Sequence, residues 1–453
     1  MLALSSGSIN DSWLVFCLGN DAFLWKFVCF SMHWSKVVGG CDADRRDHIP
    51  CGLDIFLDRS VERGMKQKRV ILKPGKEKAV HHHHHWIFSG AIASSPSYEN
   101  GEILPVYASN HVLLGHAYFN RQSSIAGRMV AFGESDPEKT IRENLEKAIQ
   151  FRKAWFHGKN TTAYRLVNGE GDSLPGLIVD QYADYLVIQI STMGMERLKG
   201  LIVSELNRLL APQLIYEKSL LPSRKEEGLQ PFQDILMGNL PDEVEIFENG
   251  LRFKVSIVQG QKTGFFLDHR EMRQEIRQLA AQKRVLNCFS YTGGFSVYAV
   301  AGGAESVDSV DISEKAIEEA KINMELNSSQ CKSEFYCEDV FEFLRSSTLD
   351  YDLVILDPPA FAKKKSDQIS ACRAYKDINR VAMQKMPKGS LLLTSSCSYY
   401  VDESLFQKVV FQACEEAKRS AKIIGRHHLA PDHPINLAHP EGDYLKSLLL
   451  FIS

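Results

Sequence analysis

The sequence predicts an α/β protein whose C-terminal part is a mostly parallel, doubly wound sheet. A small β-barrel and a mixed α+β domain are expected to precede it. Three observations lead to this prediction. From residue 284 onward, apolar strand-like runs alternate with helical stretches, as in successive β-α-β units. Residues 66–135 carry only short β-type runs between turn residues, and 453 residues are too many for one hydrophobic core.

Composition describes an ordinary globular protein with 44% apolar and 24% charged residues. A net charge of −3 argues against a uniformly basic surface but is compatible with a local basic groove. No apolar run approaches ~18 residues, so we expect no membrane-spanning helix. The ten cysteines form no CxxC pair, which favours free thiols in a reducing cytoplasm.

Residues 1–64 differ from the rest of the chain. They contain four of the ten cysteines and three of the five tryptophans, without a helical or strand period. A signal peptide is not indicated, because Asp11 and Asp21 precede the first lysine, Lys26. We expect Met65 to be the natural start and residues 1–64 to be a disordered or non-native extension.

The expected barrel spans residues 65–135, with strands at 70–72, 103–107 and 112–119. Its opening is basic, with Lys66, Lys68, Arg69, Lys73, Lys76 and Lys78 against Glu77. A charge run is most often a solvated face. The alternative is a stripe that contacts RNA phosphates, with Lys73 and Lys76 as candidates.

Five consecutive histidines, His81 to His85, stand immediately before Trp86. With a reference pKa near ~6.5, their rings are mostly neutral at pH 7 and attract phosphate less than the lysines do. We expect adventitious nickel binding by this run, and no dedicated metal site.

The middle domain is expected over residues 136–255. Asp136 and Pro137 begin a helix that reaches about residue 155, with apolar residues at helical spacing. Strands at 163–167, 176–179 and 185–190 follow, then a helix over 196–210 and strands at 245–247 and 251–258.

The C-terminal domain, residues 256–453, contains the alternating pattern. Its strands are expected at residues 285–289, 306–310, 334–337, 351–356 and 390–393, and one connecting helix at 314–326. Residues 422–424 and 444–452 are expected to close the sheet as an antiparallel hairpin.

The first three of these strands end in residues suited to a nucleoside cofactor. The candidates are Asn287, Phe289, Tyr291, Gly293 and Gly294 after the first strand, Asp311 after the second and Asp339 after the third. Adjacent glycines allow close backbone approach, and an acid at the end of the second strand can accept ribose hydroxyls. NAD and S-adenosylmethionine both fit this order. GxGxxG is absent, so the turn that holds a pyrophosphate is missing, and S-adenosylmethionine does not need it.

The next two strands end in an acid and a thiol. Asp357, followed by two prolines, comes directly after the strand at 351–356, and Cys397 follows the strand at 390–393. Asp357 is also a candidate cofactor contact, next in order after Asp311 and Asp339. If these strands are neighbours, both side chains meet over one pocket. A single cysteine is most often a small buried hydrophobe, which is our interpretation of Cys288. An acid beside a thiol instead suits attack on a pyrimidine ring, with thiolate addition at C6 activating C5.

From Met65 onward the chain resembles the bacterial class I S-adenosylmethionine-dependent large-subunit ribosomal RNA cytosine-5 methyltransferases with an N-terminal PUA domain. The motifs that carry the resemblance lie at residues 72–75, 86–90, 260–268, 287–296, 357–363, 396–398, 432–434 and 440–446. The family implies a PUA barrel, a middle domain and a Rossmann-like catalytic domain with a seven-stranded sheet. It also implies S-adenosylmethionine as cofactor, large-subunit ribosomal RNA as partner and often a homodimer. The histidine run departs from it, since relatives usually have Arg-Arg-His-Pro there.

The resemblance also suggests roles for single residues. It favours contact of Lys262 and Asp268 with cofactor or RNA, whereas the plainer interpretation is a charged loop that caps the next helix. Asp357 would bond the N3 and N4 edge of the cytosine. Related enzymes with Asp-Pro-Pro-Cys have a second cysteine where this chain has Ala360, so the motif does not identify the base that removes the C5 proton. A water and a basic residue near Lys363 are the candidates.

Two alternatives stay open. A guanine-N7 or amino-group methyltransferase could use the same scaffold, although such reactions need no cysteine and Ala360 separates Asp-Pro-Pro from Phe361. An inactive RNA-binding assembly factor is the other alternative, and equilibrium binding of S-adenosylmethionine separates it from an enzyme. The target nucleotide and the choice between naked RNA and an assembling particle are not encoded in these motifs.

Overall fold

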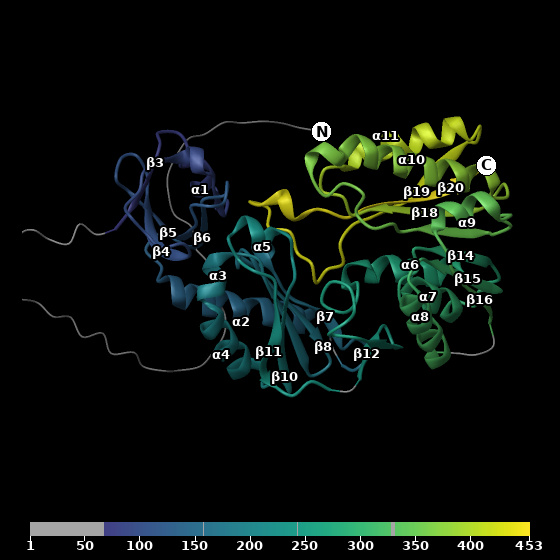
Figure 1. Cartoon of the computed structure of the whole chain (residues 1–453), viewed down its shortest axis with the longest axis horizontal. Helices are drawn as coiled ribbons and strands as arrows, with labels where there is room; N and C mark the ends of the chain where they lie inside the picture. The colour runs from purple at the N-terminus through teal and green to yellow at the C-terminus, as the bar shows by residue number, and fades with distance from the viewer. Residues whose placement is uncertain (1–67, 157, 242, 328–330) are drawn as a thin grey trace, which may run out of the picture. The chain divides into compact units, whose positions relative to one another are not determined.

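The computed structural model describes residues 68–156, 158–241, 243–327 and 331–453 (Figure 1). All of them fall within the second of the two units into which the chain divides, residues 66–453. The expectations for residues 1–64 and for a start at Met65 lie outside this part. Within it, no helix is long and apolar enough to cross a membrane.

The first sheet has six strands in the order β2-β6-β5-β4-β1-β3. Their bounds are β1 Val70–Leu72, β2 Trp86–Ile87, β3 Ile92–Ser94, β4 Glu102–Tyr107, β5 Leu113–Phe119 and β6 Gly127–Phe132, with the short helix α1, Lys78–His81, after β1. Only β1 and β4 pair in parallel. Alternating side chains such as Val70, Leu72, Val106 and Met129 fill its core. The three predicted strands are present, and β2, β3 and β6 were not predicted.

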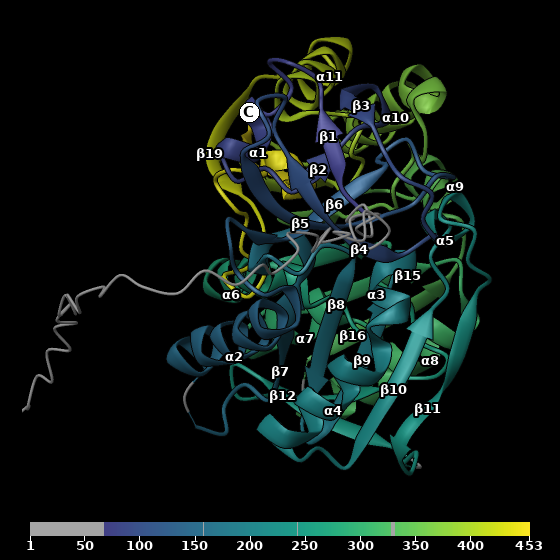
Figure 2. The ribbon, with the colours of Figure 1, turned by 90° about the vertical axis from the view of Figure 1, so that its left-hand side faces the viewer.

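The second sheet follows helix α2, Pro137–Trp155, which begins as predicted because the side chain of Asp136 accepts a hydrogen bond from Lys139 N at 2.8 Å. Its order is β11-β10-β9-β8-β7. The bounds are β7 Ala163–Asn168, β8 Leu177–Tyr182, β9 Tyr185–Ile190, α3 Met193–Arg197, α4 Lys199–Leu210, β10 Leu214–Ser219, α5 Ser223–Glu226 and β11 Phe232–Gly238. One face of the sheet packs against α2 and α4, through residues such as Leu145, Leu206 and Ile188 (Figure 2).

The other face of this sheet shares a core with the C-terminal domain. Tyr182, Val187 and Leu214 pack in the same cluster as the hairpin of β12, Val244–Glu248, and β13, Leu251–Val255. That cluster continues to Val285 in the C-terminal sheet. The boundary drawn from the sequence at residue 255 therefore crosses a continuous hydrophobic core.

The C-terminal sheet has seven strands in the order β16-β15-β14-β17-β18-β20-β19. Their bounds are β14 Arg284–Cys288, β15 Ser306–Asp311, β16 Lys332–Cys337, β17 Leu353–Leu356, β18 Leu391–Ser396, β19 Ala421–His427 and β20 Lys446–Ile452. β20 alone runs opposite to the other six strands, because it pairs antiparallel with β18 on one side and β19 on the other. This confirms the predicted mostly parallel sheet and its closing hairpin.

Successive side chains of a strand point to opposite faces of the sheet, so alternate residues of these strands pack into two separate cores. Val285 and Ile355 face a core that includes residues of α6 and α7, whereas Leu286 and Leu356 face one that includes residues of α9, α10 and α11. The helices are α6 Arg270–Leu279, α7 Gly294–Ala301, α8 Glu314–Asn327, α9 Val340–Ser346, α10 Gln368–Lys385 and α11 Glu403–Glu416. With both faces covered, the carboxyl edge of the sheet is the place where a ligand can enter.

Candidate active site

A pocket with a volume of about 350 Å³ lies at the carboxyl ends of five strands. The residues that contribute to it directly after β14, at the end of β15, and after β16, β17 and β18 are Phe289, Asp311, Asp339, Asp357 and Cys397. The strand ends singled out from the sequence are thus brought together. Strand β18 continues to Ser396, three residues beyond the predicted end, so Cys397 is the first residue after it.

The turn after β14 has an unusual backbone. Phe289 and Tyr291 adopt positive φ angles of 58° and 47°, which residues other than glycine rarely do. Tyr291 N donates to Asp311 Oδ2 at 2.9 Å, which ties this turn to the end of β15. Both aromatic residues line the pocket, as does Gly294. Gly293 has φ 77°, and a Cβ there would lie 3.0 Å from Ala320 Cβ, so its role is close packing of α7 on α8.

Asp311 and Asp339 present carboxylate oxygens to the pocket. The two oxygens of Asp311 accept from Tyr291 N and Ser313 N, each at 2.9 Å. A carboxylate has about four acceptor sites, so Asp311 can still accept two ribose hydroxyls. Asp339 caps α9 through Oδ1 alone, at 2.8 Å from Phe341 N, which leaves Oδ2 for a ligand amino group.

Asn287 does not line the pocket, contrary to the sequence-based assignment. Its side chain is buried within β14, and Nδ2 donates to Ser296 Oγ at 2.9 Å on helix α7. The residue stands between Leu286 and Cys288, so the strand alternation directs it to a face of the sheet instead of its edge. Its contribution is to hold α7 against β14.

Asp357 and Cys397 follow neighbouring strands, since Leu356 of β17 pairs with Thr394 of β18. Both side chains are half-buried and line the same pocket. Burial raises the pKa of Asp357 above its usual range, and His269, whose Nε2 lies 3.6 Å from Oδ2, acts in the opposite direction. Burial and the nearby Asp357 raise the pKa of the Cys397 thiol to about 11. Without a bound ligand, this cysteine is therefore protonated at pH 7.

Cys288, by contrast, is fully buried in β14, and burial raises the pKa of its thiol. It belongs to the core beneath α9 and α10, as the sequence predicts.

Known proteins match almost all of the described chain. Residues 231–436 match a family model described as S-adenosylmethionine-dependent methyltransferase, and residues 70–132 match one described as a PUA-like domain. The chain is 42% identical over 390 residues to ribosomal RNA large subunit methyltransferase I of Pseudoalteromonas atlantica, covering 84% of this chain and 98% of the relative. The chain belongs to the ribosomal RNA large subunit methyltransferase I family. The protein of that name from Aliivibrio fischeri is also 42% identical, over 386 residues, 83% of this chain and 97% of the relative.

Solved structures agree with this membership. A candidate S-adenosylmethionine-dependent methyltransferase from Streptococcus mutans superimposes with a TM-score of 0.72 at 25% identity, covering 84% of this chain and 99% of that one. Another candidate methyltransferase, complexed with SAH, gives a TM-score of 0.74 at 26% identity, with the same coverage. The pocket lies at the strand ends of this methyltransferase domain, and its carboxylates and aromatic rings fit S-adenosylmethionine. When bound, this cofactor supplies an electrophilic methyl group.

Within the motif at residues 260–268, Lys262 lines the pocket and Asp268 does not. Asp268 is buried and accepts from Lys262 Nζ at 2.6 Å and from Tyr444 Oη at 2.7 Å, both through Oδ2. Burial acts to raise the pKa of Asp268, but the positive charge of Lys262 holds it well below the usual range. The expected contact of Asp268 with cofactor or RNA is therefore not present in this geometry. Its position is structural, and it holds Lys262 at the pocket.

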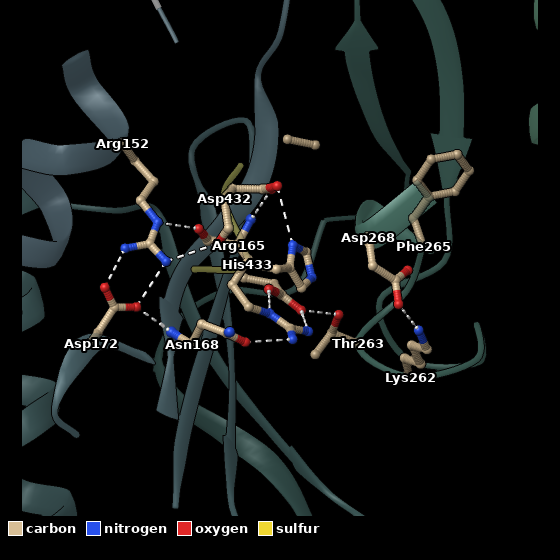
Figure 3. A network of polar contacts seen from close by, with 12 residues as sticks. Arg152, Arg165, Asn168, Asp172, Lys262, Thr263, Phe265, Asp268, Asp432 and His433 are labelled. Carbon is tan, nitrogen blue, oxygen red and sulfur yellow. Dashed lines mark hydrogen bonds and ion pairs between the residues drawn. The ribbon is translucent and has the colours of Figure 1, made fainter. Parts of the chain in front are cut away.

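A buried polar network fixes residues 432–434 against the second sheet (Figure 3). Asp432 Oδ2 accepts from Arg165 N at 2.8 Å and from Arg270 Nη2 at 2.9 Å, and Oδ1 lies 3.1 Å from His433 Nδ1. Arg152 bonds Asp172 and also donates to the carbonyl of Asp432 at 2.8 Å. The motif at residues 432–434 thus anchors the methyltransferase domain to the middle sheet.

The remaining lysine candidates lie outside the pocket and are exposed. Lys363 follows Asp-Pro-Pro, and its backbone N donates to Asp367. In the PUA-like domain, Lys73 Nζ donates to Gly90 O at 2.9 Å, and Lys76 lines a separate cavity with Trp86.

Sequence reasoning missed several pocket residues: Phe266, His269, Arg273, Phe295 and Phe341. Phe266 and His269 directly surround Leu267 and Asp268, so they could have been found by following the motif onward. Arg273 and Phe295 lie on α6 and α7, and only the packing of these helices brings them to the strand ends.

Proposed function

We propose that this protein methylates C5 of a cytosine in large-subunit ribosomal RNA through a covalent adduct of Cys397. One observation carries the proposal: an acid and a thiol line the same pocket as the cofactor-binding carboxylates. Large-subunit RNA is the substrate that the relatives' names give for those proteins.

The chemistry follows from the low nucleophilicity of C5 in cytosine. Attack of the Cys397 sulfur on C6 forms a C–S bond and shifts electrons toward N3 and C5. A hydrogen bond from Asp357 to the N3 and N4 edge stabilises that shift, and its raised pKa makes the protonated, donating form accessible. C5 then takes the methyl group, loses its proton to a base, and the C–S bond breaks to restore the ring and the thiolate.

Activation of Cys397 requires a positive charge, because its pKa is about 11 in the free protein. Lys262 already favours the thiolate, although burial and Asp357 outweigh it. When S-adenosylmethionine is bound, Cys397 would lie near its sulfonium charge as well as near Lys262, and both cations would favour the thiolate. Cofactor binding and nucleophile activation are thereby coupled.

RNA binding would involve the PUA-like domain and exposed lysines. Lys73 and Lys76 are the candidates there for phosphate contact, and Lys363 is the candidate beside the pocket. A homodimer and a cytoplasmic location rest on the resemblance to the family and form part of the same proposal.

Nucleoside analysis tests the proposed product. Ribosomal RNA from cells lacking this protein is incubated with the purified full-length chain and S-adenosylmethionine, digested and analysed by mass spectrometry. We expect 5-methylcytidine that forms only with the cofactor present. Formation of 7-methylguanosine or an N-methylated nucleoside would instead support the nitrogen-methylating alternative. Absence of cofactor binding in calorimetry would support the inactive assembly factor.

A further inference from the structure

Two imidazoles and one carboxylate meet outside the active site. His84 precedes β2 in the PUA-like domain, and His439 and Glu441 lie in the connection between β19 and β20. His84 Nε2 is 3.2 Å from Glu441 Oε1, and His439 Nδ1 is 3.6 Å from Glu441 Oε2. One donor atom from each of the three residues falls within 4.8 Å of the others.

This donor set has the composition of a zinc site with three protein ligands and an open fourth position. With metal–ligand bonds of about 2.1 Å, tetrahedral geometry separates ligand atoms by about 3.4 Å. Glu441 Oε2 lies 3.3 Å from His84 Nε2 and 3.6 Å from His439 Nδ1, on either side of that value. The donor atoms of His84 and His439 lie within 4.8 Å of each other, so an approach of at most about 1.4 Å completes the triangle.

Burial supports a site that is built into the fold. His439 is buried, and its Nδ1 has no hydrogen-bond partner among the described residues. Such an atom is uncommon in a folded protein and calls for an explanation. Trp86 packs against His439 with ring centroids 4.5 Å apart, and its indole N–H is held by Glu170 at 2.8 Å. The wall behind the imidazole is therefore fixed.

An adjoining cavity gives the site an entry path. Its volume is about 410 Å³, and its lining includes His84, Glu441, Trp86 and Lys76. A water molecule there could occupy the fourth coordination position. One contact must be given up: Trp86 N lies 3.2 Å from His84 Nδ1, and coordination through Nε2 places the ring proton on Nδ1.

We propose that His84, His439 and Glu441 bind one zinc-class dication, which links the PUA-like domain to the segment that precedes β20. The site is distinct from adventitious binding by the histidine run, because His81, His82 and His83 are exposed and His84 is not. The expectation of no dedicated metal site treated the five histidines as equivalent. Glu441 stands three residues before Tyr444, which bonds Asp268 next to the active-site pocket, so the ion would also stabilise that segment.

Calorimetry on chelator-treated full-length protein tests the site, with zinc as the titrant. A background variant carrying His81→Gln, His82→Gln and His83→Gln removes the exposed imidazoles. We expect this background variant to bind one equivalent of zinc with micromolar or tighter affinity. His439→Gln or Glu441→Gln, added to this background, should weaken that equivalent at least tenfold.

Cobalt absorption provides an independent readout. Cobalt(II) in the background variant should show the visible bands of tetrahedral coordination, and Glu441→Gln should abolish them while circular dichroism stays unchanged. The proposal would be overturned if the background variant itself bound no zinc with micromolar affinity. It would also be overturned if Glu441→Gln in this background still bound one equivalent of zinc equally tightly. His439→Gln serves as the second variant if Glu441→Gln does not fold.

Discussion

Asp357 Oδ2 lies 3.6 Å from His269 Nε2, and both side chains line the pocket that contains Cys397. Burial favours the protonated carboxyl, whereas the neighbouring imidazole favours the charged form. Burial outweighs the imidazole and raises the pKa of Asp357, which favours donation of a proton or hydrogen bond to a bound base.

Replacement of Asp357 by asparagine should remove this exchange while keeping the shape of the side chain. We expect the single-turnover methylation rate to fall by about 10²- to 10⁴-fold, the usual contribution of a general acid or base. Cofactor affinity, measured by calorimetry, should change little. The matched control is Asp350→Asn, an exposed position shortly before the same strand. A rate close to wild type in Asp357→Asn would remove the residue from the reaction.

Asp311→Ala should weaken S-adenosylmethionine binding by about 1.5–3 kcal/mol, the range for hydrogen bonds that involve a charged group. The change also removes the hydrogen-bond acceptor of Tyr291 N. Asp311→Asn keeps one acceptor oxygen, so it should lose less binding free energy than Asp311→Ala. Glu314→Ala, an exposed acid three residues further on, is the control. Unchanged affinity in Asp311→Ala would exclude its contact with the ribose.

Alkylation of Cys397 should depend steeply on pH. The thiolate is the reactive form, and the pKa is about 11 in the free protein, so the rate should rise about tenfold per pH unit from pH 7 to 9.5 without a plateau. Mass spectrometry of the Cys397 peptide distinguishes it from the other free thiols. Because both ligands cover the cysteine similarly, a faster reaction with S-adenosylmethionine than with SAH would reflect the sulfonium charge. A plateau near pH 8 in the free protein would contradict this account.

Asp432→Ala should destabilise the fold by about 3–5 kcal/mol, because the buried Arg270 loses its hydrogen-bonded carboxylate and keeps only Glu248, 3.4 Å from its Nε. Glu245→Ala breaks an exposed pair with Arg252 and should cost no more than about 1 kcal/mol in the same chemical denaturation. A similar, small loss in both variants would refute the anchoring role of the network.

The same network has a predicted pH dependence. Burial acts to raise the pKa of the Asp432 carboxyl, but Arg270 and His433 hold that pKa below its usual value of 3.8. The folded carboxylate therefore stabilises the protein above that pH, and the contribution is lost as the pH falls below it. Asp432→Asn should accordingly show a shallower loss of stability in acid than wild type does.

The positions of the parallel strands along the chain, and the meeting of the residues at their ends, could be predicted from the sequence because both are local signals. Short apolar runs identify β14 to β18, and polar residues at their ends lie together in any parallel sheet. Asn287 was misassigned because it was judged by its motif, although the alternation within β14 already directs it away from the edge.

The contacts that were missed depend on residues far apart in the chain. Asp268 is withdrawn from the pocket by Tyr444, 176 positions later, and Asp432 bonds Arg165 across 267 positions. Likewise, His84 meets Glu441 across 357 positions. No periodicity or spacing in the sequence encodes such pairs, since they arise only when the domains pack.

Covalent trapping on a fluorinated substrate shows whether the Cys397 sulfur attacks C6 of the target cytosine. RNA that carries 5-fluorocytosine at the target position is incubated with enzyme and S-adenosylmethionine, then separated by denaturing electrophoresis. Fluorine at C5 cannot leave as a proton does, so wild-type protein should accumulate a stable protein–RNA adduct. Cys397→Ala should form none, whereas Cys372→Ala, which removes another half-buried thiol, should form it normally. An adduct or methylated cytosine from Cys397→Ala would contradict the proposed mechanism.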